Sequence, residues 1–153
     1  MSPLKNPSRF EWFVEKSTEI GISEITPLIT KFSEKKKVNM SRLNKIVISS
    51  MKQSNQFYLP KVNPITSFDE FLKLNKDYKL IAHLKNNNSF NNESIGSKDK
   101  IVVMIGPEGG FSKEEILKAN KEKIKEISFG KNRFRSETAG VFAVSIINNY
   151  KNL

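Results

Sequence analysis

The sequence contains no cysteine and only one histidine, His83. The lack of cysteine excludes disulfide bonds and thiolate metal sites. A single histidine disfavours a histidine-rich metal site and a histidine-centred catalytic triad. No apolar run is long enough to cross a bilayer, and residues 1–9 lack the apolar stretch of a signal peptide. We therefore expect a cytoplasmic protein that uses neither a metal ion nor a membrane.

Positive charge is in clear excess. The 153 residues include 26 Lys and Arg against 16 Asp and Glu, which gives a net charge of +10. Such an excess favours a polyanionic partner, because phosphate contacts supply much of the affinity of proteins for nucleic acids. A lysine-rich surface that only keeps the protein in solution would explain the same charge, so charge alone does not decide. The length suits a single domain.

The first half of the chain carries signals for helix ends. Asn6 and Pro7 predict the start of a helix, and Gly21 predicts its end. An extended stretch over 24–30 follows, in which Pro27 disfavours a central strand. Ser41 is expected to cap a second helix. Two further helices are expected to begin at capping boxes, which are formed by Ser67 with Glu70 and by Ser112 with Glu115.

Strands and helices alternate in the second half. The expected strands are 79–84, 100–105 and 126–129, the expected helices 112–122 and 137–150, and a polar loop spans 85–99. Residues 100–105, KIVVMI, form a β-branched apolar run that is typical of a buried parallel strand. The alternation predicts an α/β fold with a mainly parallel sheet flanked by helices.

A glycine-rich turn follows that apolar strand. Its sequence, IGPEGGFS, runs from Ile105 to Ser112 and leads into the next helix. Ligands of open α/β sheets bind beyond the carboxyl ends of strands, and glycine lets the backbone approach a ligand closely. A tight turn that binds nothing would explain these residues equally well. The turn matches neither the phosphate-loop pattern nor G-x-G-x-x-G, which disfavours a small dinucleotide-binding domain.

A basic loop follows the last expected strand. Its sequence, FGKNRFRSETA, spans 129–139 and brings arginine, serine, glutamate and threonine close together. Arginine makes forked contacts to phosphate or carbonyl oxygens, which favours a binding role. In the alternative interpretation, Ser136 caps the last helix, Glu137 favours the positive end of that helix, and the arginines are solvated.

The pair of sequences IGPEGGFS and FGKNRFRSETA resembles the ribosomal RNA small subunit methyltransferase E family. Arg9, Lys16 and residues 18–21 resemble its first helix, and Gln53-Ser54 with Leu59-Pro60 resembles another segment, so the resemblance covers nearly all 153 residues. It implies S-adenosylmethionine-dependent methylation of N3 of a uridine in 16S rRNA of the small ribosomal subunit. It also implies a SPOUT-type fold with a deep C-terminal trefoil knot, and a homodimer that forms near the last helix.

The resemblance assigns roles to individual residues. The implied cofactor-binding residues are His83, Leu84, Ile105, Gly106, Gly110, Phe129, Gly130, Phe134 and Arg135. Arg135 is also the candidate that stabilises negative charge on the uracil carbonyl oxygens. Glu137 would orient Arg135 or take the N3 proton, and we favour orientation because a glutamate beside arginines is a weak base. The implied RNA-binding residues are Arg9, Lys16, Gln53, Ser54 and Arg133.

Three departures from the family leave alternatives open. The family usually carries an N-terminal PUA-like RNA-binding domain that nothing in residues 1–153 could form, so we expect the methyltransferase domain alone. Gln56 and Asn132 stand where arginine is common, which affects RNA contacts more than cofactor binding. One alternative is a SPOUT enzyme that methylates a ribose 2′-hydroxyl, although that group typically has Ser-Leu-Asn at 136–138. The other is a basic RNA-binding module without catalysis.

Overall fold

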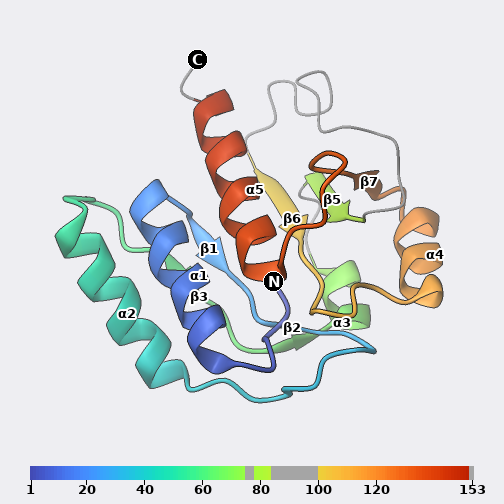
Figure 1. Ribbon diagram of the computed structural model, residues 1–153, viewed down its shortest axis with the longest axis horizontal. Coiled ribbons are helices and arrows are strands. Elements are labelled where there is room, and N and C mark those ends of the chain that lie inside the picture. Colours follow the sequence, from blue (N-terminus) through green and yellow to red (C-terminus); the bar gives the residue numbers. More distant parts are fainter. Residues whose placement is uncertain (75–77, 84–99, 152–153) are drawn as a thin grey trace.

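A computed structural model describes residues 1–74, 78–83 and 100–151 (Figure 1). Its helices are α1 (Pro7–Ile20), α2 (Met40–Gln53), α3 (Phe68–Lys73), α4 (Lys113–Lys121) and α5 (Ser136–Lys151). Its strands are β1 (Glu24–Ile25), β2 (Leu28–Ile29), β3 (Lys61–Val62), β4 (Thr66–Ser67), β5 (Tyr78–Ala82), β6 (Ile101–Met104) and β7 (Lys125–Ile127). The expected helices and the expected strands of the second half are confirmed in order, whereas β3 and β4 were not predicted. The loop predicted over 85–99 lies outside the described residues.

The first helix begins and ends where the sequence indicates. The Asn6 side chain accepts a hydrogen bond from the Ser8 amide at 3.0 Å, and Gly21 closes α1 in the left-handed conformation with φ of 110°. The start predicted for α2 is wrong by two residues. Asn39, and not Ser41, is the cap, because its side chain accepts from the Arg42 amide at 3.0 Å. Both predicted capping boxes are present at the starts of α3 and α4.

All the strand pairs are parallel within the described residues. β5 lies between β6 and β7, while β1 pairs with β3 and β2 pairs with β4. Thr26 and Pro27 separate β1 from β2, as expected for a proline within an extended stretch. The first residues connect this part to β6, since the Leu28 amide donates to the Met1 carbonyl at 3.0 Å and the Ser2 amide to the Ile105 carbonyl at 2.9 Å.

Two apolar clusters cover the two faces of the sheet. One involves α1, α2 and α5 and includes Phe10, Phe13, Val14, Leu43, Val47, Ile105 and Ala143. The other involves α3 and α4 and includes Phe68, Ile81, Met104, Phe111, Ile116 and Ala119. Because Met104 and Ile105 are neighbours that belong to opposite clusters, helices bury both faces, as in an α/β fold with a parallel sheet.

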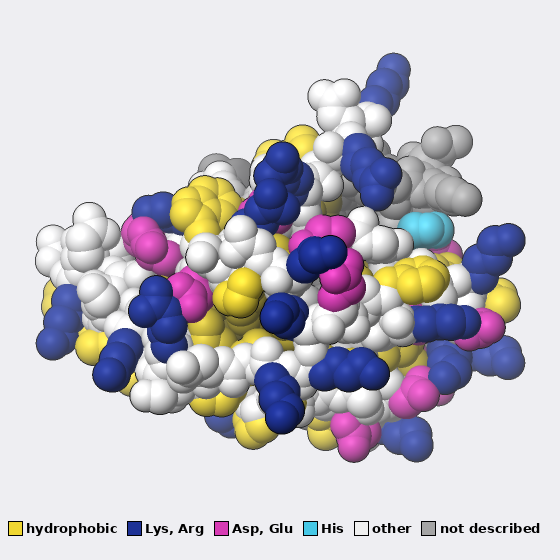
Figure 2. All heavy atoms as spheres, turned by 60° about the horizontal axis from the view of Figure 1, so that its bottom comes forward, with side chains coloured by type: hydrophobic (Ala, Val, Ile, Leu, Met, Phe, Trp, Pro, Cys, Tyr) yellow, Lys and Arg dark blue, Asp and Glu magenta, His cyan; other side chains and the backbone are white. Residues whose placement is uncertain are grey.

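The surface is rich in charged side chains. Lysine and arginine side chains are spread widely over the face shown in Figure 2 and are interspersed with carboxylates and apolar side chains. Within the described residues, no helix combines the length and the apolar character that spanning a bilayer requires.

A buried lysine closes the C-terminal end of α3, and its removal is expected to destabilise the fold. The Lys79 Nζ donates to the carbonyl oxygens of Phe71 at 3.0 Å and Leu72 at 2.9 Å, and also to that of Leu74. Lys79→Met keeps the apolar stem but leaves these carbonyls without a charged donor, which we expect to cost about 2 kcal/mol of unfolding free energy.

Urea unfolding of Lys79→Met and of Lys45→Met, which replaces an exposed lysine on α2, measures this contribution. A similar small effect in both variants would show that the contacts of Lys79 do not stabilise α3.

Candidate active site

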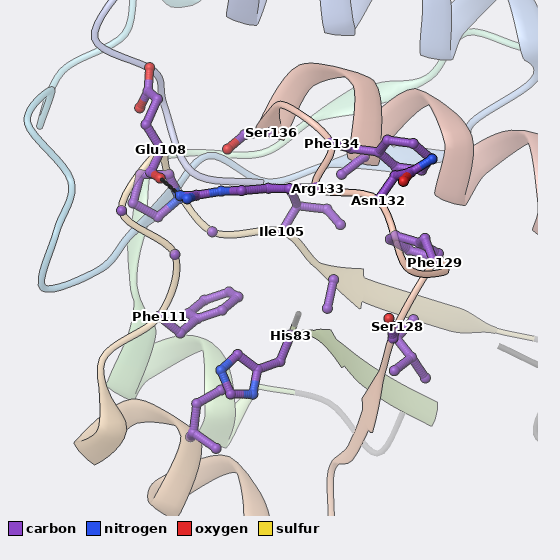
Figure 3. Close-up of a pocket in the computed structure, with 18 of the residues that line it drawn as sticks. His83, Ile105, Glu108, Phe111, Ser128, Phe129, Asn132, Arg133, Phe134 and Ser136 are labelled. Atoms are coloured by element: carbon purple, nitrogen blue, oxygen red, sulfur yellow. Dashed lines mark hydrogen bonds between the residues drawn. The ribbon is translucent and has the colours of Figure 1, made fainter. Parts of the chain in front are cut away.

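A cavity of about 650 Å³ opens beyond the carboxyl ends of β5, β6 and β7 (Figure 3). This size lies in the usual range for small-molecule sites, about 300–1,000 Å³. The strand ends, the glycine-rich turn, the basic loop and α4 all contribute to its wall. The residues that line it include His83, Ile105, Gly106, Glu108, Gly110, Phe111, Lys113, Ser128, Phe129, Asn132, Arg133, Phe134 and Ser136. The position agrees with the rule that α/β sheets bind ligands at this edge.

The glycine-rich turn forms one wall of the cavity and requires glycine at two positions. A Cβ at Gly106 would lie 3.0 Å from the carbonyl carbon of Gly110, so the turn is too tight for a side chain there. Gly110 has φ of +72°, and a Cβ built on it meets no atom within 4 Å. A side chain at Gly110 would therefore be strained and would occupy open space, whereas glycine leaves the backbone accessible to a ligand.

The basic loop forms the opposite wall and is anchored in two ways. The Phe129 and Phe134 rings both pack edge-on against Phe142 of α5, with centroids 5.6 and 5.3 Å away. The Arg133 side chain reaches across the cavity and donates from Nη2 to the Glu108 carbonyl at 3.3 Å (Figure 3). The two sequences that carry the resemblance thus face each other across one cavity.

A hydrogen-bonded chain fixes His83 at the rim. The Nδ1 atom of His83 lies 2.9 Å from Glu126 Oε2, and the other oxygen of Glu126 accepts from Asn120 Nδ2 at 2.9 Å. The carboxylate, itself held by Asn120, secures one edge of the imidazole, so the ring has a fixed orientation beside Phe111 (Figure 3). A carboxylate that holds one ring nitrogen leaves the other available to a ligand.

The structure brings together most of the predicted cofactor residues. Six of them line the cavity, namely His83, Ile105, Gly106, Gly110, Phe129 and Phe134. Gly130 lies in the same loop without lining the cavity, and Leu84 lies outside the described residues. Arg135 is exposed and does not line the cavity, but both of its neighbours in the chain do. Arg133, predicted as an RNA contact, is part of the wall.

Glu137 faces Arg9 and not Arg135. Its carboxylate is buried at the start of α5, with Oε1 3.7 Å from Arg9 Nε. Among the described residues, Oε2 has no hydrogen-bond partner, and no ion pair joins Glu137 to Arg135. The expectation that Glu137 orients Arg135 thus finds no contact in the structure, because α1 packs against α5 and supplies a different arginine.

The other predicted RNA-binding residues do not gather at the cavity. Lys16 donates to Glu15 at 2.8 Å and to Glu19 at 2.9 Å, and these hydrogen bonds raise the pKa of Lys16. Gln53 and Ser54 lie at the C-terminal end of α2, on the side of the molecule away from α4 (Figure 1). Cavity residues such as Ser128, Asn132 and Phe111 were not predicted, although they stand within or next to the two motifs.

The sequence of this chain matches a known protein family. The RNA methyltransferase domain family matches residues 1–148. The chain belongs to this family. The resemblance found in the two motifs is thereby confirmed, and the cavity between them is the candidate active site of an RNA methyltransferase domain.

Two similar proteins, from different bacteria, carry the same name. The ribosomal RNA small subunit methyltransferase E of Rickettsia conorii is 36% identical over 136 residues, which cover 86% of this chain and 56% of the relative. That of Mesomycoplasma hyopneumoniae is 33% identical over 149 residues, which cover 93% of this chain and 64% of the relative. The chain thus spans less than two thirds of the length of these relatives.

Solved structures share the fold of this RNA methyltransferase domain. A probable rRNA-methyltransferase from Porphyromonas gingivalis superposes with a TM-score of 0.93 at 29% identity and covers 99% of this chain and 66% of its own. The ribosomal RNA small subunit methyltransferase E of Neisseria gonorrhoeae, solved with bound S-adenosyl methionine, gives 0.84 at 28% identity, with 97% and 63% covered.

Proposed function

We propose that residues 1–153 form a SPOUT methyltransferase domain that binds S-adenosylmethionine in the cavity and methylates N3 of a uridine in 16S rRNA. The observation that carries this proposal is the meeting of the glycine-rich turn and the basic loop at one cavity, at the edge of the sheet where ligands bind. The names of the relatives and the S-adenosyl methionine bound to the Neisseria protein support the substrate class and the cofactor.

The residues present fit this cofactor. The open Cα of Gly110 and the neighbouring backbone can approach a flat adenine closely, and Ile105, Phe129 and Phe134 supply apolar walls. The fixed imidazole of His83 and the Ser128 hydroxyl add polar groups. A mostly apolar cavity with a few polar groups is typical of small-molecule sites, so the cavity suits a nucleoside with a polar tail.

Substrate binding would use the positive groups of the basic loop. When bound, S-adenosylmethionine supplies an electrophilic methyl group on a sulfonium, and the protein must hold uracil N3 in line with it. Because N3 is normally buried in a base pair, we expect an unpaired or flipped uridine. Arg135, between two residues of the cavity wall, would stabilise the charge that develops on the uracil carbonyl oxygens as the N3 proton leaves.

Three further properties belong to the same proposal. The resemblance supports a deep trefoil knot in the C-terminal part of the chain, a homodimer that forms near α5, and action in the cytoplasm on the small ribosomal subunit. For the dimer, the exposed Phe142 on α5 adds an apolar side chain of the kind that subunit interfaces cover.

Calorimetric titration of the chain with S-adenosylmethionine tests the proposed cofactor. We expect saturable binding, and weaker binding of an equally charged analogue that lacks the adenine base. A folded chain that binds RNA but not S-adenosylmethionine would contradict the proposal and favour an RNA-binding module without catalysis.

His83 is expected to contribute to cofactor affinity through its anchored ring. Replacing it by alanine removes one directed hydrogen bond and a wall of the cavity, so we expect S-adenosylmethionine affinity to fall by about tenfold. Asn120→Ala removes only the hydrogen bond from Asn120 to Glu126, which is one step away from His83, and should have a much smaller effect. Calorimetry on both variants checks this, and equal affinities for the native chain and His83→Ala would rule out a ligand contact by His83.

A further inference from the structure

An exposed aromatic side chain lies on the edge of the glycine-rich turn. Phe32 is 47% exposed, although large apolar side chains are usually covered. A Cβ built on Gly109 would lie 3.1 Å from the Phe32 Cβ, so the two residues are in close contact. Gly109 lines the cavity and Phe32 does not, so Phe32 packs against a residue of the cavity wall without being part of that wall.

A buried polar network holds the backbone on both sides of Phe32. Ser33 Oγ accepts from the Thr30 amide at 2.9 Å and lies 2.7 Å from Ser2 Oγ. The Lys31 amide donates to Glu115 Oε1 at 2.8 Å. Ser2, Thr30, Ser33 and Glu115 are all buried. This network holds the backbone from which the half-exposed Phe32 side chain projects.

Charged residues of both signs flank Phe32 in the sequence. Lys31 precedes it and pairs with Glu114 at 2.9 Å, and Glu34 follows two residues later and pairs with Lys5 at 3.2 Å. Lys113 and Arg133 line the neighbouring cavity. An exposed aromatic ring close to a cavity with cations in its wall is an arrangement that proteins use to stack nucleobases while contacting phosphates, because every base offers a flat π-face.

We propose that Phe32 is a stacking platform for a nucleobase of the RNA substrate, either the target uridine as it approaches the cavity or its neighbour. The proposal rests on the proposed function for the nature of the substrate. It adds a positioning residue outside the two motifs, on a loop whose flanking residues are held by buried hydrogen bonds. Preorganisation matters here, since an aromatic ring already in place loses little conformational freedom on binding.

A tryptophan reporter tests stacking directly. Trp12 is the sole tryptophan of the sequence, so Trp12→Phe combined with Phe32→Trp leaves one indole at the proposed site. We expect oligouridylate to quench its fluorescence, and an abasic oligonucleotide of the same length to bind without quenching. The control combines Trp12→Phe with Leu74→Trp, at a half-exposed position at the C-terminal end of α3 that no assigned RNA contact includes, and should not be quenched. Oligouridylate that binds without quenching the indole of the Phe32→Trp variant would overturn the proposal.

Affinity measurements complete the test. Phe32→Ala and Phe32→Leu should weaken oligouridylate binding by about tenfold, the usual contribution of one stacked base, while Phe32→Tyr retains it. Binding of the abasic oligonucleotide and of S-adenosylmethionine should stay unchanged. Equal losses for both oligonucleotides, or a parallel loss of cofactor affinity, would show that Phe32 only supports the turn. A native chain that binds RNA but no S-adenosylmethionine refutes the proposed function, and quenching still reports on Phe32.

Discussion

Gly110→Val is expected to reduce S-adenosylmethionine affinity by at least about a hundredfold, because two effects act at one position. The backbone at Gly110 has φ of +72°, which a β-branched residue adopts only with strain. Its Cβ would also enter open space next to the cavity. Either the side chain occupies the place of the ligand, or the turn shifts and the backbone groups that face the ligand move. Calorimetric titration measures the loss.

Backbone strain alone would not lower cofactor affinity. A substitution at a second glycine with positive φ separates the effect of strain from the effect of filling the ligand space. Gly21 also has positive φ, 110°, but lies at the end of α1 and away from the cavity lining. Gly21→Ala should lower the melting temperature and leave cofactor affinity unchanged. Gly110→Ala should fall between the native chain and Gly110→Val in affinity. If Gly110→Val binds S-adenosylmethionine normally, the glycine-rich turn is not the cofactor site.

Arg135→Ala is expected to slow methyl transfer by about a hundredfold while cofactor affinity stays close to that of the native chain. This magnitude is typical for the loss of one group that stabilises a developing oxyanion. Arg135 does not line the cavity, yet its neighbours Phe134 and Ser136 do, so its side chain is available to a substrate that covers the opening. Transfer of labelled methyl groups to small ribosomal subunits, at saturating cofactor and subunit, measures the rate.

Two substitutions in the same loop serve as controls. Arg135→Lys keeps the charge and loses the forked geometry, so we expect an intermediate rate. Lys131→Ala removes another exposed cation, and should weaken subunit binding without changing the rate at saturation. A rate for Arg135→Ala that recovers fully at high subunit concentration would mean that Arg135 contacts phosphate and does not act on the uracil.

The ends of most helices could be predicted because the contacts that form them lie close together in the sequence. Asn6, Gly21 and the two capping boxes make hydrogen bonds within four residues, so their sequence spacing specifies the contact. Asn39 was missed as the cap of α2 because Ser41, two residues later, is also a residue type that caps helices. Sequence spacing alone does not distinguish the two. The parallel pairing of β5 with both β6 and β7 depends on contacts far apart in sequence, which periodicity indicates only as a class.

In the candidate site, too, residues within the motifs could be predicted and contacts between distant segments could not. The two motifs identified most of the cavity wall, because the glycine-rich turn supplies the continuous run 105–111 and the basic loop supplies several further lining residues. The pairing of Glu137 with Arg9 was not predicted, since it depends on how α1 packs against α5. Glu126 was missed as the partner of His83 because their contact depends on the pairing of β5 with β7. Phe32 was missed because nothing in its own segment shows that it touches Gly109. Tertiary packing, and not residue type, decides these contacts.

The identity of the methylated atom tests the central claim most directly. The chain is incubated with labelled S-adenosylmethionine and small ribosomal subunits that lack the modification, and the 16S rRNA is digested to nucleosides and analysed by mass spectrometry. We expect the label in 3-methyluridine at one position. Label on a ribose 2′-oxygen would contradict the proposed reaction and assign the domain to the 2′-hydroxyl methyltransferases of the same fold.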